Sequence, residues 1–333
     1  MVDITVLVNK PVHEESLARL QDEVQVLTPY DASEEELIAL LQHVHGLVLG
    51  AGLHMGSQEM GLASNLVVIG RHGVGLDNVD LAAATSEGIP VVYTPYGPTE
   101  STAEHALMLM LSTARRVSQL DRGVRSGDFS LRNRAECMGY ELEGKSLGVV
   151  GFGRIGRRVA AMCRDALHMK VFVYDPGLDA AEVSAWGAVP KPTLNGLAQE
   201  VDVLSVHTPL TQATRGLISS RVIGAMKAGA MLINTSRGPV VDEAALSKAL
   251  AEGHLAGAGL DVYDPQPPAE DNPLLHFDHV VLTPHVGSFT HEGRRRMGAM
   301  VVDGVLSVLQ GRRPKYLANP QVWPGRRRLG EER

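Results

Sequence analysis

The 333-residue sequence is poor in cysteine, has no long apolar run and carries no excess of positive charge. Its two cysteines, Cys137 and Cys163, form no spaced disulfide framework, which fits the reducing cytosol. No apolar run approaches the roughly 18 residues of a membrane span, and the first residues lack the basic stretch of a secretory signal. These absences predict a cytoplasmic protein that is not inserted in a membrane.

Binding of nucleic acid or metal is not expected either. The 31 basic and 38 acidic residues give a net charge of −7, which disfavours a nucleic-acid partner. No spacing of histidine, cysteine and aspartate suggests a metal site. A hydrophobic content of 44% and a charged content of 21% are ordinary for globular proteins. At this length we expect two domains, each with its own core.

Short apolar segments alternate with helical patterns along the whole chain, and no internal repeat is present. Strands are expected at residues 5–8, 24–27, 47–49, 66–69, 91–94, 147–150, 171–174, 203–206, 231–234, 256–262 and 280–282. Ser33 with Glu36 forms a capping-box pattern, and Asp80 and Asp242 are candidate helix caps. Such alternation predicts parallel sheets with helices on their faces, so the predicted fold class is α/β.

Two long helical patterns, at about 99–120 and about 290–309, are candidates for the connections between the domains. We expect hinges near the start of each pattern. The predicted architecture is a pair of Rossmann-like or flavodoxin-like domains. In it, a cofactor domain, residues 99–290, is inserted in a discontinuous substrate domain, residues 1–98 and 291–333, which acts as a catalytic lid.

A glycine-rich stretch follows the strand predicted at 147–150. Gly151, Gly153 and Gly156 have the spacing of the dinucleotide-binding fingerprint and lead into a helical segment. In that fingerprint the first glycine permits a tight turn, the second lets the backbone approach a pyrophosphate, and the third lets the helix pack close to the strand. The helix N-terminus then offers N–H groups to the phosphates.

An acidic residue follows the next strand. Asp175 lies 24 residues after Gly151 and directly after the strand predicted at 171–174. Its carboxylate would accept hydrogen bonds from a ribose diol and repel a 2′-phosphate, so NAD is favoured over NADP. The β–α–β unit therefore predicts a NAD-binding domain.

Polar residues follow three further predicted strands, where an open α/β sheet presents its ligand crevice. They lie in the segments 234–238, 260–266 and 282–287. Arg237 offers a planar, permanent charge suited to a carboxylate or a developing oxyanion. His285 can carry a proton near neutral pH. Hydride transfer to nicotinamide needs such a pair, because one group holds the acid and the other takes the hydroxyl proton.

Several motifs, in the same order, resemble the D-isomer-specific 2-hydroxyacid dehydrogenase family, in particular its D-3-phosphoglycerate-dehydrogenase-like branch. They are Arg71–Asp80, Thr94-Pro95, Ser101–His105, Gly144–Gly156, Asn234–Asp242 and Thr283–His285. The resemblance covers nearly all of the chain. It implies a NAD-dependent oxidoreductase that interconverts a small anionic D-2-hydroxy acid (of the 3-phosphoglycerate, glycerate or glycolate type) and its 2-keto acid, and that forms a homodimer.

The resemblance also implies roles for individual residues. Arg237 would bind the substrate and His285 would be the catalytic acid/base. Arg71 and the backbone of Val74 and Gly75 would bind the anionic groups of the substrate. The other implied positions line the cofactor: Arg154 and Ile155 at the pyrophosphate, and Thr102, His207, Thr208, Pro209, Thr235 and Asp261.

Two positions depart from the family pattern. Gln266 stands where a glutamate usually partners the histidine, and an amide orients a histidine without the charge that stabilises imidazolium. Asp264 is the alternative partner. Pro98 stands where many members carry an asparagine beside the substrate. Gln266 leaves two rivals to the dehydrogenase: a NAD-sensing binding protein with weak or vestigial catalysis, and a formate-dehydrogenase-like enzyme. Retention of Arg237 and His285 argues against a sensor.

Overall fold

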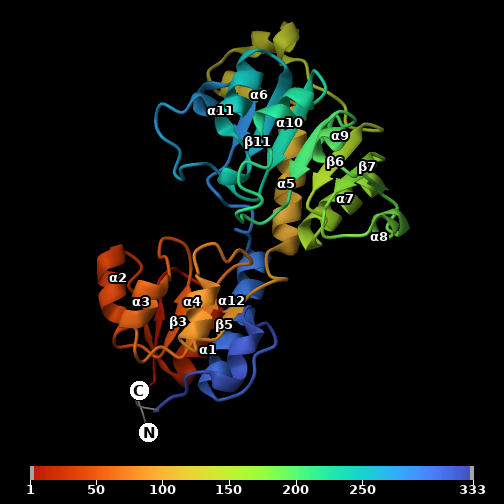
Figure 1. The fold of residues 1–333 in the computed structure, drawn as a ribbon. Helices are drawn as coiled ribbons and strands as arrows, with labels where there is room; N and C mark the ends of the chain where they lie inside the picture. The colour runs from red at the N-terminus through yellow and green to blue at the C-terminus, as the bar shows by residue number, and fades with distance from the viewer. Residues whose placement is uncertain (1–3, 331–333) are drawn as a thin grey trace. The chain divides into compact units, whose positions relative to one another are not determined.

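The computed structural model describes residues 4–330 and has two compact units, each built on a parallel sheet (Figure 1). Unit 1 comprises the chain up to Thr99 together with the chain from Phe289 onward, and unit 2 comprises Glu100–Ser288. The predicted α/β class with two Rossmann-like or flavodoxin-like domains is confirmed. Among the described helices, none is long and apolar enough to cross a bilayer.

Unit 1 holds a five-stranded sheet in the order β2-β1-β3-β4-β5, with every pair parallel. This is the strand order of flavodoxin-like folds. Its elements are β1 (Thr5–Val8), α1 (Glu14–Glu23), β2 (Gln25–Leu27), α2 (Glu34–Leu41), β3 (Gly46–Leu49), α3 (Ser57–Leu62), β4 (Val68–Arg71), α4 (Leu81–Ser86), β5 (Val91–Tyr93), α12 (His291–Leu309) and the 3-10 helix η5 (Pro320–Gly325).

Alternation of apolar side chains along the strands gives unit 1 two cores, one on each face of the sheet. Leu7, Leu47 and Ile69 face α2, α3 and α4, whereas Val6 and Val48 face α1 and α12. The C-terminal helix α12 therefore completes the unit that the first 99 residues begin.

Unit 2 holds a seven-stranded parallel sheet in the order β12-β11-β10-β9-β6-β7-β8. The first strand, β6, lies inside the sheet: β7 and β8 are added on one side of it, and β9 to β12 are added on the other. The order of addition thus reverses between β6 and β9, as in the Rossmann fold. The strands are β6 (Ser146–Val150), β7 (Lys170–Tyr174), β8 (Val189–Pro190), β9 (Val203–Val206), β10 (Ala230–Asn234), β11 (Leu255–Leu260) and β12 (Val280–Leu282).

The helices of unit 2 are α5 (Thr99–Ala114), α6 (Val117–Arg125), α7 (Arg154–Leu167), α8 (Ala180–Ala185), α9 (Leu194–Ala198), α10 (Ser220–Ala225) and α11 (Glu243–Ala251), with 3-10 helices η1 (Phe129–Asn133), η2 (Ala135–Cys137), η3 (Gly238–Val240) and η4 (Pro273–His276). All of the α-helices except α6 cover the two faces of the sheet. The helices α5, α7 and α8 pack on one core, and α9, α10 and α11 pack on the other.

The helix caps expected from the sequence are present. Ser33 and Glu36 form both hydrogen bonds of a capping box at the start of α2. The carboxylate of Asp80 accepts from two backbone N–H groups of α4, and that of Asp242 accepts from one of α11. The polar pattern at these helix starts was therefore sufficient to place them.

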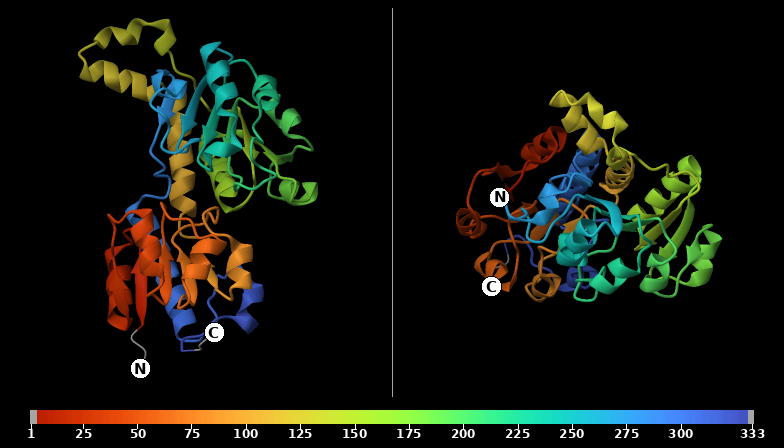
Figure 2. Two further views of the ribbon diagram at one scale, coloured as in Figure 1. Left: turned by 60° about the vertical axis from the view of Figure 1, so that its left-hand side comes forward. Right: turned by 90° about the horizontal axis from the view of Figure 1, so that it is seen from above.

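The long helix expected over about 99–120 is confirmed as far as Ala114 and is wrong beyond it. The helix α5 ends at Ala114, and Arg116 adopts a left-handed conformation with φ of 55° before α6 begins. The chain then forms α6, η1 and η2, which project from the rest of unit 2 as an arm, residues 117–137 (Figure 2). Helical periodicity continues across the break, so it did not reveal the change of direction.

Candidate functional site

The glycine-rich turn joins β6 to α7 at the carboxyl edge of the sheet. Gly151 has φ of +89°, and a Cβ there would approach the backbone of His207 and the side chain of Thr208 to 2.9 Å. A Cβ on Gly156 would overlap the carbonyl oxygen of Gly151. Gly153, in contrast, has no neighbouring atom within 4 Å of such a Cβ. Two glycines therefore serve packing, and the third leaves space above the helix N-terminus.

Asp175 follows β7 and connects to the same turn. Its Oδ2 accepts from the N–H of Phe152 at 2.8 Å, and its Oδ1 accepts from the N–H of Gly177 at 2.9 Å. Each carboxylate oxygen has a second lone pair, so Asp175 can hold the turn and still accept a ribose hydroxyl. Position and remaining acceptor capacity both suit the adenosine ribose of NAD.

Unpartnered buried polar atoms occur at the ends of β9 and β10. They are Nδ1 of His207, Oγ1 of Thr208 and Oγ1 of Thr235. Such atoms normally have a protein or ligand partner, because burial without one costs about 1–3 kcal/mol. All three positions were implied as cofactor-lining, and a ligand rich in hydroxyl and amide groups would satisfy them. The residues present therefore fit NAD.

His207 is a neutral group in this setting. Burial lowers the pKa of its imidazole from the ordinary 6.5 to about 4, and Nε2 lies 2.8 Å from Oγ of Ser205. The other implied cofactor residues occupy the same edge of unit 2: Thr102 is buried in α5, Arg154 and Ile155 begin α7, and Pro209 lies exposed beyond β9. Within residues 4–330 no group of histidine, cysteine and acidic side chains could hold a metal ion.

Arg237 lies in the loop after β10, and its local fold explains its position. The side chain of Asn234 accepts from the N–H and Oγ of Ser236 and donates to the carbonyl of Arg237, which closes a tight loop. A Cβ on Gly238 would overlap the backbone of Tyr263, so the loops after β10 and β11 are in close contact. Arg237 Nη1 donates to the carbonyl of Ser236 at 2.7 Å.

His285 and Gln266 are in direct contact. The Nδ1 atom of His285 lies 2.8 Å from Nε2 and 3.2 Å from Oε1 of the Gln266 amide. The carboxylate of Asp264, the alternative partner, instead lies 3.9 Å from the guanidinium of Arg215. His285 has a left-handed backbone with φ of 56°, which is uncommon outside glycine.

Asp261 is buried directly behind the His285 loop. Its carboxylate accepts from Oγ1 of Thr283 at 2.6 Å and from the N–H groups of Val286 and Gly287 at 2.9 and 2.8 Å. Burial by itself would raise the pKa of Asp261, but these bonds and the nearby His105 outweigh it and lower the pKa. The implied cofactor residue is thus also the anchor of the loop that carries His285.

The implied substrate residues of unit 1 lie at the carboxyl end of β4. Arg71 is the last residue of β4, and its Nη1 donates to the carbonyl of His72 at 2.6 Å. Val74 and Gly75 follow in a loop and are half-buried. His72 was missed from the sequence: its Nε2 is buried without a partner, and burial followed by the charges of Arg71 and Arg294 lowers its pKa to about 4.

The geometry of unit 2 defines the class of site. A Rossmann sheet and a glycine turn with an acid at the next strand form a site that fits a dinucleotide, and a histidine–amide pair lies at the same sheet edge. Residues 107–287 match the family model described as the D-isomer specific 2-hydroxyacid dehydrogenase, NAD binding domain. The chain belongs to the D-isomer specific 2-hydroxyacid dehydrogenase family and contains its NAD-binding domain.

Individual relatives agree with this placement. The chain is 40% identical to a D-3-phosphoglycerate dehydrogenase of Archaeoglobus fulgidus over 96% of its own length, and spans 60% of that relative. It is 36% identical to a glyoxylate reductase of Korarchaeum cryptofilum over 95% of its length and 96% of the relative's. The crystal structure of the TT0316 protein from Thermus thermophilus has a TM-score of 0.86 at 37% identity, covering 95% of this chain and all of that one.

Proposed function

We propose that this protein is a NAD-dependent dehydrogenase that interconverts a small D-2-hydroxy acid and its 2-keto acid. The observation that carries the proposal is the His285–Gln266 contact at the carboxyl edge of a sheet whose glycine turn and Asp175 fit NAD. Family membership supports the reaction type. When bound, NAD supplies the hydride acceptor or donor for C2 of the acid.

The side chains of unit 2 would handle the charge and the proton of the reaction. Arg237 would bind the substrate and stabilise negative charge on its oxygens. His285 would take the hydroxyl proton during oxidation and return it during reduction. Gln266 can serve both states of the ring, because its Oε1 accepts from a protonated Nδ1 and its NH₂ can donate to an unprotonated one.

Unit 1 would supply the substrate-binding surface, and residues 99–290 would form the NAD-binding domain of a cytoplasmic enzyme. The backbone of Val74 and Gly75 would hold the carboxylate, and Arg71 would bind a second anionic group. The substrate would be of the 3-phosphoglycerate, glycerate or glycolate type, and of these only 3-phosphoglycerate carries a second anionic group for Arg71. The support is the position of these residues in and after β4 and the names of two relatives, a D-3-phosphoglycerate dehydrogenase and a glyoxylate reductase.

The test is a substrate panel read by the absorbance of NADH. Glyoxylate, hydroxypyruvate and phosphohydroxypyruvate are each offered with NADH and with NADPH. We expect NADH oxidation with at least one of the acids and a fall of about 10²–10⁴-fold in kcat for His285→Ala, with an unchanged Tm. Binding of NADH without turnover on any acid would instead identify a sensor. Near-normal turnover of His285→Ala would remove the role given to His285.

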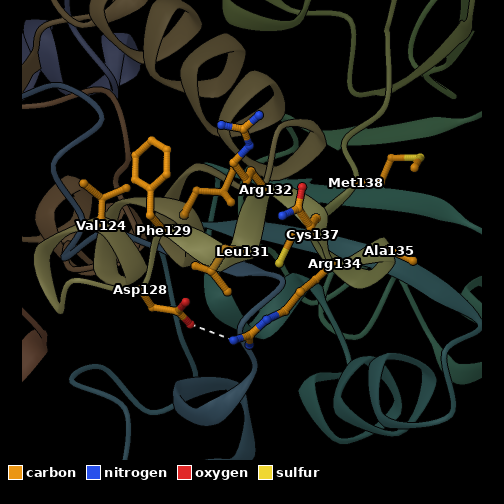
Figure 3. Close-up of a pocket in the computed structure, with 11 residues that line it drawn as sticks. Val124, Asp128, Phe129, Leu131, Arg132, Arg134, Ala135, Cys137 and Met138 are labelled. Atoms are coloured by element: carbon orange, nitrogen blue, oxygen red, sulfur yellow. Dashed lines mark hydrogen bonds and ion pairs between the residues drawn. The ribbon is translucent and has the colours of Figure 1, made fainter.

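We further propose that the protein is a homodimer joined through the α6–η1–η2 arm. A groove of about 520 Å³ runs along the arm (Figure 3). The apolar side chains of Val124, Phe129 and Met138 line it, and their exposed fractions are 59%, 68% and 72%. Exposure of this degree in large apolar residues that line one groove is typical of an interface. A second copy satisfies it, because an isologous contact pairs the same patch with itself.

Sedimentation equilibrium tests the dimer. Phe129→Asp places a charge in the groove and should weaken dimerisation at least 10-fold. Val189→Asp, on β8, is the matched control, since Val189 is also an exposed apolar residue of unit 2, at 46%. A monomeric wild-type protein, or equal dimerisation of the two variants, would contradict the proposal.

A further inference from the structure

The left-handed turn at His285 needs a restraint. A residue other than glycine with φ near +56° is disfavoured by about 1 kcal/mol or more relative to extended or helical backbone. The two residues after it, Val286 and Gly287, donate their N–H groups to the carboxylate of Asp261. These two hydrogen bonds to Asp261 therefore stabilise the left-handed conformation at His285.

A histidine of another element reaches the same carboxylate. His105 lies on α5, 178 positions from Thr283 in the chain, and its Nε2 is 2.9 Å from Oγ1 of Thr283 and 3.3 Å from Oδ1 of Asp261. The side chains of His105 and Asp261 are only 14% and 2% exposed. The three side chains form one compact cluster under the loop that presents His285.

The number of hydrogens available in this cluster determines which group donates in each of its hydrogen bonds. Thr283 has one hydroxyl hydrogen, and the 2.6 Å contact with Asp261 requires it, because a carboxylate only accepts. Oγ1 of Thr283 must then accept from His105, so Nε2 of His105 carries a hydrogen. The chain runs from His105 to Thr283 to Asp261, and each donor polarises the next.

We propose that His105 is a positioning residue for His285: through Thr283 it fixes the Asp261 carboxylate that closes the left-handed turn. His105 makes no contact with Gln266 among the bonds of the described residues, so it acts through the backbone of the turn. Loss of the His105 hydrogen bond leaves the Thr283 hydroxyl without the donor that polarises it, so the Asp261 carboxylate is less firmly placed and its hold on Val286 and Gly287 weakens.

Amide hydrogen exchange, resolved by residue with NMR, tests this inference without reference to activity. In His105→Leu we expect the N–H groups of Val286 and Gly287 to exchange at least 10-fold faster than in the wild type. His105→Gln should restore most of the protection, because its amide can donate from near the former Nε2. The matched control is His254→Leu, since Nε2 of His254 bonds only a backbone carbonyl, that of Ile223.

Unchanged exchange at Val286 and Gly287 in His105→Leu would overturn the inference, as would an equal change in the His254 control. If His105→Leu does not fold, His105→Phe removes the same donor and keeps a ring of similar size, while the direct bond from Thr283 to Asp261 stays in place. The exchange rates of that variant then decide the matter by the same criterion.

A kinetic measurement adds the functional consequence, and this part rests on the proposed dehydrogenase activity. His105→Leu should lower kcat on the order of 10-fold and change the Kd for NADH less than 2-fold, with rescue by His105→Gln. A wild type without turnover would refute the proposed function while leaving the exchange result standing. An active wild type with an equally active His105→Leu would refute the positioning role.

Discussion

Replacing Gln266 by glutamate should move the pH range over which the protein reduces keto acids. Reduction needs protonated His285, so its rate falls as the pH rises through the titration of that ring. The Gln266 amide touches Nδ1 at 2.8 Å but carries no charge. In Gln266→Glu a carboxylate would occupy that position and stabilise the imidazolium, which raises the pKa of His285 and moves the alkaline limb upward.

The size of the shift follows from the geometry. Gln266 and His285 are both exposed, so the attraction is screened nearly as in water. A carboxylate and an imidazolium joined by such a bond have charge centres about 4 Å apart, which gives about 1 kcal/mol, or roughly 0.7 of a pH unit. Any exclusion of water on ligand binding would enlarge the shift.

The assay is the pH dependence of kcat/KM for keto-acid reduction, measured at constant ionic strength between pH 5 and 10. Gln199→Glu is the control, because Gln199 caps α9 at the opposite edge of the sheet and the variant adds the same charge there. The same substitution should move the acid limb of hydroxy-acid oxidation upward, since oxidation needs the neutral ring. An alkaline limb that stays in place in Gln266→Glu would refute the claim that this side chain governs the proton on His285.

Three further predictions concern the cofactor turn, its acid and a buried histidine. Gly156→Ala should lower the free energy of unfolding by about 1–3 kcal/mol, because the new Cβ would overlap the carbonyl oxygen of Gly151. Gly153→Ala should keep the wild-type Tm and weaken NADH binding at least about 10-fold. Equal Tm values for the two variants would contradict this. Asp175→Asn should move the NADH:NADPH ratio of kcat/KM at least about 10-fold toward NADPH, and an unchanged ratio would speak against the ribose contact. The pKa of His207 is about 4 in the folded protein and 6.5 in the unfolded chain, so the unfolded chain binds the proton first as the pH drops. The free energy of unfolding should therefore fall between pH 6.5 and pH 4. Urea titrations of His207→Gln should show a shallower fall than those of the wild type.

The sequence was informative wherever one short segment determines the structure. The spacing of Gly151 and Gly156 requires a turn and a close helix, and both are present. Ser33 and Asp80 predicted the starts of two helices, and both helices begin at these caps. The alternation of strands and helices predicted parallel sheets, and every strand pair of both sheets is parallel.

Features that depend on contacts between residues far apart in the chain could not be predicted from the sequence. The Asp261–Thr283–His105 cluster joins three elements, and no local pattern ties a histidine of α5 to the loop after β12. The left-handed turns at Arg116 and His285 carry no glycine to signal them. Gln266 was recognised as the partner of His285 only through the family resemblance, and the contact itself required the structure.

The most direct test of the central claim follows the hydrogen itself. NADH that carries deuterium at both positions of nicotinamide C4 is incubated with whichever keto acid of the panel turns over, and the product is analysed for deuterium by NMR. A chiral column gives the configuration of the product from hydroxypyruvate or phosphohydroxypyruvate, since glycolate is achiral apart from the label. We predict one deuterium at C2 of a 2-hydroxy acid of D configuration, formed by the wild type and formed about 10²–10⁴-fold more slowly by His285→Ala. A product without deuterium at C2, or of L configuration, would contradict this prediction.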